Sequence, residues 1–180
     1  MEKEDFVFKI NLKFRKPQIP SIDKKELINV KYPLIEPFAY AHIFWDMENK
    51  ELIYKLEEPE LDNKEREVLK VLEDGVRELI NISYIAVKKG ETVVRYLEKN
   101  IKILMDELGI SINSDSYQKI MYYIYRDFVG LNEIEALMKD YYIEDVECNG
   151  VNTPIYIVHR KFRNLRTNVI FRDEDKLASF

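Results

Sequence analysis

The fold of this chain is decided by residues 143–171, which read IEDVECNGVNTPIYIVHRKFRNLRTNVIF. Apolar and β-branched residues gather there in three short runs, at 143–147, 155–158 and 166–171, and such residues favour strands. The pair Asn149-Gly150 is typical of a tight turn. We therefore predict three short strands in this part of the chain.

Three amphipathic helices are predicted upstream of these strands, because apolar residues recur three and four positions apart. They are expected after Asp62, at about 91–108 and at 114–129. Each has residues suited to its ends: Asp62 with Glu65 as a capping box, Gly109 as a left-handed stop, and Ser114 and Gly130 at the two ends of the third helix. A short helix around 133–138 should come next.

The first third of the chain has extended character. Residues 38–45 and 52–56, separated by a polar run, predict a β-hairpin with a longer loop. Residues 6–14 alternate apolar and polar side chains, which predicts a further strand. Four prolines between positions 17 and 37 predict an extended linker, with order resuming near Tyr32.

These elements predict an α+β fold, in which an N-terminal β-hairpin and helices are followed by a helix-plus-small-sheet unit. We expect three consecutive parts: a strand and proline-containing linker at 1–31, a hairpin and helical subdomain at 32–112, and a helix with three strands at 113–180. Asp173 is a candidate cap of one more helix, which would continue past Phe180. The sequence therefore resembles a piece cut from a longer protein.

Composition excludes several classes of protein. The net charge of -5 and pI near 5.3 argue against a general nucleic-acid binder, which needs an excess of Lys and Arg. No window approaches the ~20 apolar residues of a membrane-spanning helix, and the first residues lack the pattern of a signal peptide. The single cysteine, Cys148, allows no intramolecular disulfide, which suits a reducing cytoplasm. We expect a cytoplasmic protein without a membrane span.

The sequence offers no catalytic or metal-binding motif. Its five glycines are too far apart to build a phosphate-binding loop or a dinucleotide fingerprint. Its two histidines, His42 and His159, and its cysteine have none of the spacings of zinc ligands. We expect His42 to be a structural histidine and assign no catalytic residue.

One stretch breaks the acidic balance of the chain. Between Cys148 and Arg172 there is no Asp or Glu, while basic residues accumulate around the last two strands. Arg160, Arg163 and Arg166 are the candidates for contact with a nucleotide or a neighbouring subunit. The alternative is a basic hairpin that faces solvent or pairs with the chain's own carboxylates, and both interpretations stay open.

Several segments resemble a known family. They are residues 130–150 (GLNEIEALMKDYYIEDVECNG), 153–160, 165–171, 32–40 (YPLIEPFAY) and 58–61. In these segments the chain resembles the amino-terminal domain of archaeal type II/IV secretion system ATPases, and within that family the archaellum motor and assembly ATPase most of all. The similarity covers roughly residues 30–172.

The resemblance implies a hexameric cytoplasmic ring, held at the membrane through partners, in which each subunit hinges an amino-terminal domain to an ATPase core. ATP and Mg²⁺ would bind the full-length protein, with no cofactor expected on this chain alone. Its partners would be the core of its own and neighbouring subunits, a membrane platform protein and motor components, and no nucleic acid. The core motifs are absent from this sequence, so we expect it to be inactive alone.

The function implied is that of a non-catalytic arm that supports nucleotide-dependent domain movement, subunit contacts and partner docking. Two rivals remain. One is a free-standing protein-interaction module, and the other is a small nucleic-acid binder that uses the basic strands with Tyr156 or Phe162.

Overall fold

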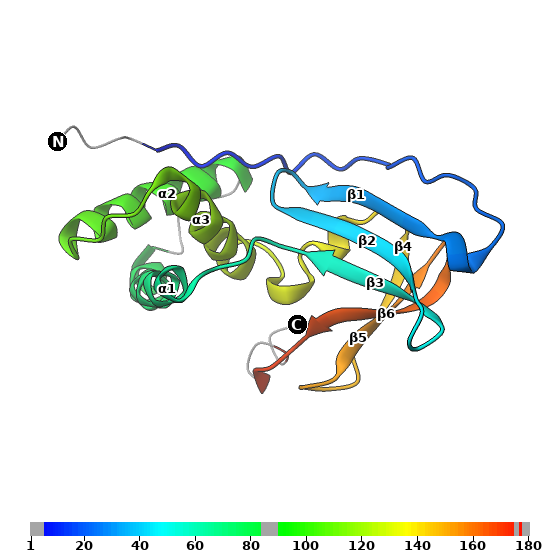
Figure 1. Cartoon of the computed structure of the whole chain (residues 1–180). Coiled ribbons are helices and arrows are strands. Elements are labelled where there is room, and N and C mark those ends of the chain that lie inside the picture. Colours follow the sequence, from blue (N-terminus) through cyan, green and yellow to red (C-terminus); the bar gives the residue numbers. More distant parts are fainter. Residues whose placement is uncertain (1–5, 84–89, 175–176, 178–180) are drawn as a thin grey trace. The chain divides into compact units, whose positions relative to one another are not determined.

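The structure of the protein, a computed structural model, describes residues 6–83, 90–174 and 177, with the backbone alone for residues 79–83 and 90–92. The strands are β1 (Asn29–Ile35), β2 (Ala39–Asp46), β3 (Glu51–Glu57), β4 (Ile143–Glu147), β5 (Pro154–His159) and β6 (Arg163–Ile170). The helices are α1 (Asn63–Ser83), α2 (Gly90–Glu107) and α3 (Ser114–Phe128), with 3-10 turns η1 (Lys25–Leu27), η2 (Asn132–Ile134) and η3 (Leu137–Lys139). The α+β class is confirmed (Figure 1).

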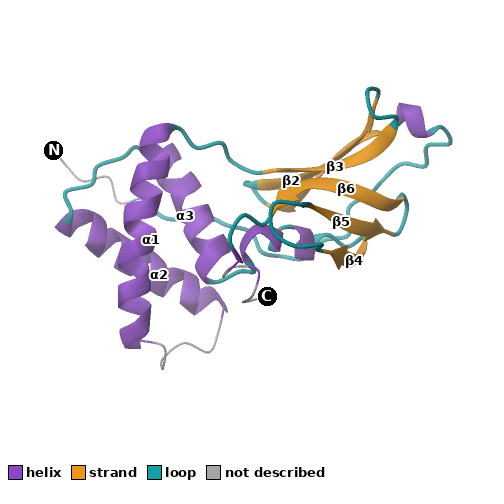
Figure 2. Cartoon of the chain, turned by 90° about the horizontal axis from the view of Figure 1, so that it is seen from below, coloured by secondary structure: helices purple, strands orange, loops and turns teal. Residues whose placement is uncertain are grey.

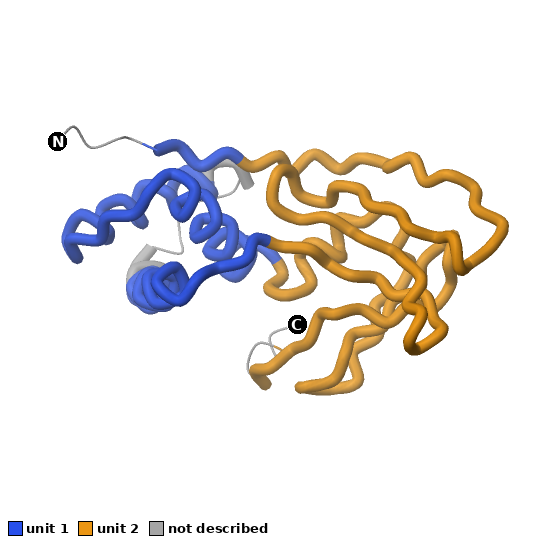
Figure 3. The backbone as a smooth tube through the Cα atoms, viewed as in Figure 1, with its two compact units in different colours: residues 1–9, 59–130 blue, residues 10–58, 131–180 orange. Residues whose placement is uncertain are grey.

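The chain forms two compact units, each built from segments that are distant in the sequence (Figure 3). Unit 1 contains residues 1–9 and 59–130, and unit 2 contains residues 10–58 and 131–180. This division differs from the three consecutive parts at 1–31, 32–112 and 113–180. The physical reason is that the hairpin pairs with strands more than a hundred residues later rather than with the helices that come directly after it.

Unit 2 is a six-stranded mixed sheet with the order β1-β2-β3-β6-β5-β4. Figure 2 draws its strands in orange. The predicted hairpin is β2 with β3, and the three predicted C-terminal strands are β4, β5 and β6. The two sets join through a parallel pairing of β3 with β6, at Ile53 opposite Arg166 and Tyr54 opposite Thr167. Because the connection between them includes all of α1 to α3, this pairing has no local sequence signal.

One face of the sheet forms the core of unit 2. Burial alternates along β2, β3, β5 and β6, so every second side chain lies in the apolar interior. The turns η2 and η3 pack against β6 and β1, and Ile134, Ala136 and Leu137 in this region are fully buried. The opposite face carries the half-buried and exposed side chains.

Two predictions for the N-terminal part are wrong. Residues 6–10 form no strand, and Asn11 makes only an isolated bridge to Glu36. Part of the predicted linker is instead β1, in which Pro33 pairs with Tyr40. Since β1 is an edge strand, the missing N–H of Pro33 leaves no neighbouring acceptor unpaired.

The three helices of unit 1 pack on one another, and their predicted apolar stripes supply the core. Leu72 and Val76 of α1 are buried, while the side chains of Leu79 and Ile80 lie outside the described residues. Gly109 ends α2 with a φ of 64°, as predicted, because glycine adopts this left-handed conformation without a steric penalty.

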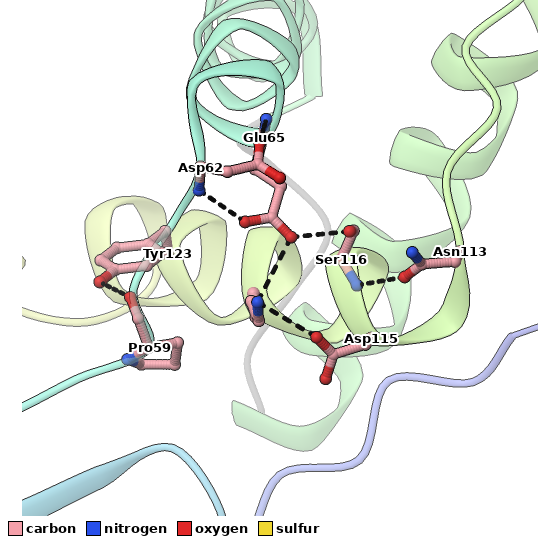
Figure 4. Close-up of polar contacts among 8 residues, drawn as sticks. Pro59, Asp62, Glu65, Asn113, Asp115, Ser116 and Tyr123 are labelled. Carbon is pink, nitrogen blue, oxygen red and sulfur yellow. Dashed lines mark hydrogen bonds and ion pairs between the residues drawn. The ribbon is translucent and has the colours of Figure 1, made fainter.

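The capping residues at the start of α1 and α3 are linked (Figure 4). Asp62 and Glu65 form the predicted capping box, in which Glu65 N–H donates to Asp62 Oδ1 at 2.8 Å and Asp62 N–H donates to Glu65 Oε2 at 2.9 Å. The cap of α3 is Asn113 rather than Ser114, since Asn113 Oδ1 accepts from Ser116 N–H at 2.8 Å. Ser116 Oγ then donates to Glu65 Oε1 at 2.6 Å.

The third helix ends at Phe128, and its C-cap N–H, that of Val129, donates to Tyr125 O. Gly130 N–H donates to the same carbonyl at 3.0 Å, so this glycine lies at the predicted helix end. The short helix predicted at 133–138 is replaced by the two 3-10 turns. Leu177 N–H donates to Asp173 O at 3.2 Å, and most of the helix expected there lies outside the described residues.

Replacing Glu65 by alanine is expected to lower the free energy of unfolding of unit 1 by about 2 kcal/mol, because the change removes one capping partner and the acceptor of Ser116 together. Urea unfolding followed by the helical circular dichroism signal measures this loss. Glu67→Ala, at an exposed position of the same helix, is the matched control. Equal midpoints for the two variants would show that the Glu65 contacts contribute nothing.

Candidate functional site

Arg166 lies on β6 and is paired within the sheet. Its Nε and Nη2 atoms donate to Glu51 Oε1 at 3.0 and 2.8 Å, and both side chains are partly exposed. An anion that reached Arg166 would therefore compete with Glu51. This arrangement is the one expected if the basic strands pair with the chain's own carboxylates.

Arg160 lies in the turn between β5 and β6, and Arg163 is the first residue of β6. Arg160 Nε lies 3.3 Å from Glu144 Oε1, and the guanidinium lies 5.1 Å from the centre of the Tyr141 ring. Arg163 is exposed, with a φ of 66° at the first residue of β6. Contact of the three arginines with a nucleotide or a neighbouring subunit stays a prediction.

The exposed face of the sheet carries a row of side chains around Arg166. Strand register places Phe44, Ile53, Arg166, Tyr156 and Glu147 side by side across β2, β3, β6, β5 and β4. Tyr156 is 38% exposed in this row. The row therefore combines two aromatic rings, one aliphatic side chain, a paired arginine and a glutamate on one surface.

Phe162, the other aromatic residue considered for nucleic-acid stacking, is only partly exposed. Its ring centre lies 4.9 Å from that of His159 with the planes at 23°, so the two rings stack. Of the two aromatic residues considered, only Tyr156 lies on the exposed sheet face.

His42 has the structural role predicted for it. Its Nδ1 lies 2.9 Å from Glu57 Oε1 and its Nε2 lies 2.8 Å from Asn29 Oδ1. Glu57 also accepts a hydrogen bond from Lys31, and this bond, followed by the one from His42, lowers the pKa of the Glu57 carboxyl. The three strands β1, β2 and β3 are thus linked on their exposed face.

The most concentrated polar chemistry in unit 2 is buried, around Asp140. This carboxylate is 5% exposed and lies directly after η3. Its Oδ2 atom accepts from the hydroxyls of Tyr32 at 2.6 Å and Tyr54 at 2.8 Å, and its Oδ1 atom accepts from Tyr142 N–H at 2.8 Å. Asp140 thereby joins β1, β3 and the turn before β4.

His159 extends this network from β5. Its Nδ1 atom accepts from the backbone N–H groups of Lys161 and Phe162 at 3.2 and 3.3 Å. The proton of the neutral ring therefore lies on Nε2, which faces Tyr32 Oη at 3.3 Å. A chain of donors runs from His159 to Tyr32 and on to Asp140.

Burial decides the protonation of these groups. Desolvation raises the pKa of Asp140, and the hydrogen bonds from Tyr32, Tyr142 and Tyr54 oppose that rise only in part. Desolvation lowers the pKa of His159 to about 4, and the charge of Lys161 adds to the effect. The pKa values of Tyr32 and Tyr54 are raised, first by burial and then by the charge of Asp140.

We call Tyr32, Tyr54, Asp140 and His159 the Asp140 cluster. It contacts both halves of the sheet, the hairpin strands and the C-terminal strands, and its buried polar atoms have partners within the unit. A buried, satisfied network of this kind fixes strand register rather than offering a group to a substrate. Its members are separated by up to 127 positions, so no local pattern in the sequence indicates it.

The described part of the chain contains no metal centre. Among the described side chains, those of residues 6–78, 93–174 and 177, no three His, Cys, Asp or Glu are placed so that they could hold a metal ion. Cys148 is a free thiol whose Sγ lies 3.8 Å from Gly150 O. Within the same described residues, no helix has the length and apolar character needed to cross a membrane.

Comparison with known proteins finds longer relatives and no matching family model. The chain is 33% identical over 138 residues to MJ1288, an uncharacterized protein of Methanocaldococcus jannaschii, in a match that covers 77% of this chain and 54% of the relative. It is 27% identical over 170 residues to MJ0900, an uncharacterized protein of the same organism, covering 84% of this chain and 30% of the relative. The chain thus spans about half the length of one relative and under a third of the other.

Proposed function

We propose that this chain is a non-catalytic module of a larger archaeal ATPase of the type II/IV secretion class, in which it contacts neighbouring subunits and partner proteins. The observation that supports the modular part of the proposal is that the chain matches parts of two longer archaeal proteins and makes up very different shares of them, 54% and 30%. A region that recurs with different amounts of additional chain behaves as a module.

The segments that resemble the secretion ATPases support this proposal through their place in unit 2. Residues 32–40 include the end of β1, the turn and the start of β2, residues 130–150 include η2, η3 and β4, and residues 153–160 and 165–171 correspond to β5 and most of β6. Three members of the Asp140 cluster lie in these segments. The resemblance is therefore carried largely by residues that build the sheet, which supports a shared fold for this unit.

A protein-interaction module that works without an ATPase core is the second candidate, and the exposed row on the sheet favours it. Tyr156 and Arg166, neighbours in this row, are residue types common in the cores of protein interfaces. The two candidates differ in the coding sequence downstream of Phe180. Under the first, the gene encodes a Gly-x-x-x-x-Gly-Lys-Ser/Thr motif there, and a stop codon directly after Phe180 would refute it.

Replacing Arg166 by alanine is expected to leave this chain folded, because a partly exposed ion pair contributes at most about 1 kcal/mol. In the ATPase that contains the module, the same change should reduce ring assembly or ATP turnover, because an arginine desolvated against an anion or a subunit contributes much more. Sedimentation velocity and phosphate release on the full-length protein measure the two effects.

Glu51→Gln is the matched variant, since it breaks the same pair but keeps the arginine. If Arg166 acts on another subunit or on nucleotide, Glu51→Gln retains assembly and turnover. If both variants lose activity equally, the pair itself is structural, and if neither does, Arg166 is ordinary surface. The 180-residue chain alone, which lacks a phosphate-binding loop, should release no phosphate in the same assay.

A further inference from the structure

Residues 6–9 are held by helix side chains rather than by a strand. Gln118 of α3 contacts their main chain twice: its Oε1 accepts from Lys9 N–H at 3.1 Å and its Nε2 donates to Val7 O at 2.7 Å. A single amide thus contacts a carbonyl and an N–H two residues apart, much as a neighbouring strand would. Such recognition depends on an extended backbone and is independent of the side chains.

A second main-chain contact comes from α2. Glu98 Oε1 accepts from Phe8 N–H at 2.7 Å. The same oxygen accepts from the hydroxyl of buried Tyr117 at 3.0 Å and lies 3.7 Å from Lys102 Nζ. The carboxylate is therefore held in place by α2 and α3 independently of the segment that it binds.

Alternate side chains of the segment face the helices. Phe8 is 7% exposed, whereas Val7 is 56% exposed. The ring of Phe6 lies 5.7 Å from that of Tyr117, at an angle of 41°. An extended chain directs side chains i and i+2 to the same side, so the helices contact Phe6 and Phe8 while Val7 faces solvent.

We propose that Glu98, Tyr117 and Gln118 form a peptide-binding site for an extended Phe-x-Phe segment, and that residues 6–9 of this chain are its resident, exchangeable ligand. The same segment of a second copy carries identical groups and enters the site when the resident segment is displaced. A resident segment has an effective concentration on the order of millimolar, so it excludes a free peptide of the same sequence until its own contacts are weakened. This inference does not depend on the proposed function.

The test is a fluorescence-anisotropy titration of a labelled peptide of residues 6–11, FVFKIN, against the full 180-residue chain. The Phe8→Ala chain, whose resident segment is weakened, is expected to bind the peptide at least ~10-fold more tightly than the unmodified chain. Adding Gln118→Ala to that chain should abolish the gain. The Val7→Ala chain, altered at an exposed position of the same segment, is the matched control and should behave as the unmodified chain.

Equal peptide binding by the unmodified and Phe8→Ala chains, or a gain that survives Gln118→Ala, would overturn the proposal. If circular dichroism shows that the Phe8→Ala chain does not fold, hydrogen exchange measured on the single variant Gln118→Ala tests the proposed site instead. The amides of Phe8 and Lys9, which donate to Glu98 and Gln118, are then expected to exchange about 10-fold faster while α2 and α3 keep their protection. Unchanged exchange at these amides would equally refute the site.

Discussion

Replacing Asp140 by alanine is expected to lower the free energy of unfolding of unit 2 by about 3–5 kcal/mol. The change leaves the hydroxyls of Tyr32 and Tyr54 and the N–H of Tyr142 without their acceptor in the interior of the unit. Removing one member of a buried polar network has effects of this size, because the remaining groups stay desolvated. Such a loss is a large fraction of the ~5–15 kcal/mol that stabilises an ordinary domain.

Urea unfolding followed by the fluorescence of Trp45, the single tryptophan of the chain and part of β2 in unit 2, measures this effect, and two variants serve as controls. Asp140→Asn keeps an oxygen acceptor and nearly the same volume, so its loss should be smaller than that of Asp140→Ala. Asp145→Ala changes an exposed aspartate of β4 and should stay within about 0.5 kcal/mol of the unmodified chain. If Asp140→Ala resembled Asp145→Ala, the cluster would have no role in stability.

Acidification from about pH 7.5 to pH 5 is expected to destabilise unit 2 through His159. The pKa of His159 is lowered from 6.5 to about 4 on folding, so the folded state favours the neutral ring. The stability that this preference contributes is complete above the unfolded pKa of 6.5 and is lost as the pH falls from there toward about 4. Between pH 6.5 and about pH 4 the shift in the pKa of His159 corresponds to a loss of about 3 kcal/mol in the free energy of unfolding.

The sign for Asp140 is the reverse. Burial raises its pKa, so the folded state favours the protonated carboxyl, and this contribution grows as the pH falls through the folded pKa. Urea unfolding at several pH values separates the two groups through His159→Asn, which cannot gain a proton and should remove most of the acid-induced loss. His42→Asn, on the exposed face of the same sheet, should leave that loss in place. Identical pH profiles for the His159→Asn and unmodified chains would rule out this origin.

Local sequence determined the elements that depend on neighbouring residues. The capping box of Asp62 and Glu65, the glycine stop at Gly109 and the alternating strands after residue 143 all act within a few positions. These elements depend on a capping hydrogen bond, a permitted φ and a periodic apolar face. None of these features needs a partner from elsewhere in the chain. These elements and the α+β class were therefore predictable.

Tertiary structure decided which other parts of the chain these elements pack against. A period of two fits any extended segment, so residues 6–14 predicted a strand. In the structure the ring of Phe6 lies against Tyr117, and the main chain of residues 7–9 bonds to the side chains of Glu98 and Gln118. The pairing of β3 with β6 and the burial of Asp140 depend on the packing of apolar faces that are about a hundred residues apart in the sequence. Nothing near Asp140 in the sequence distinguishes it from a surface carboxylate, because the two tyrosine hydroxyls that make its burial possible come from β1 and β3.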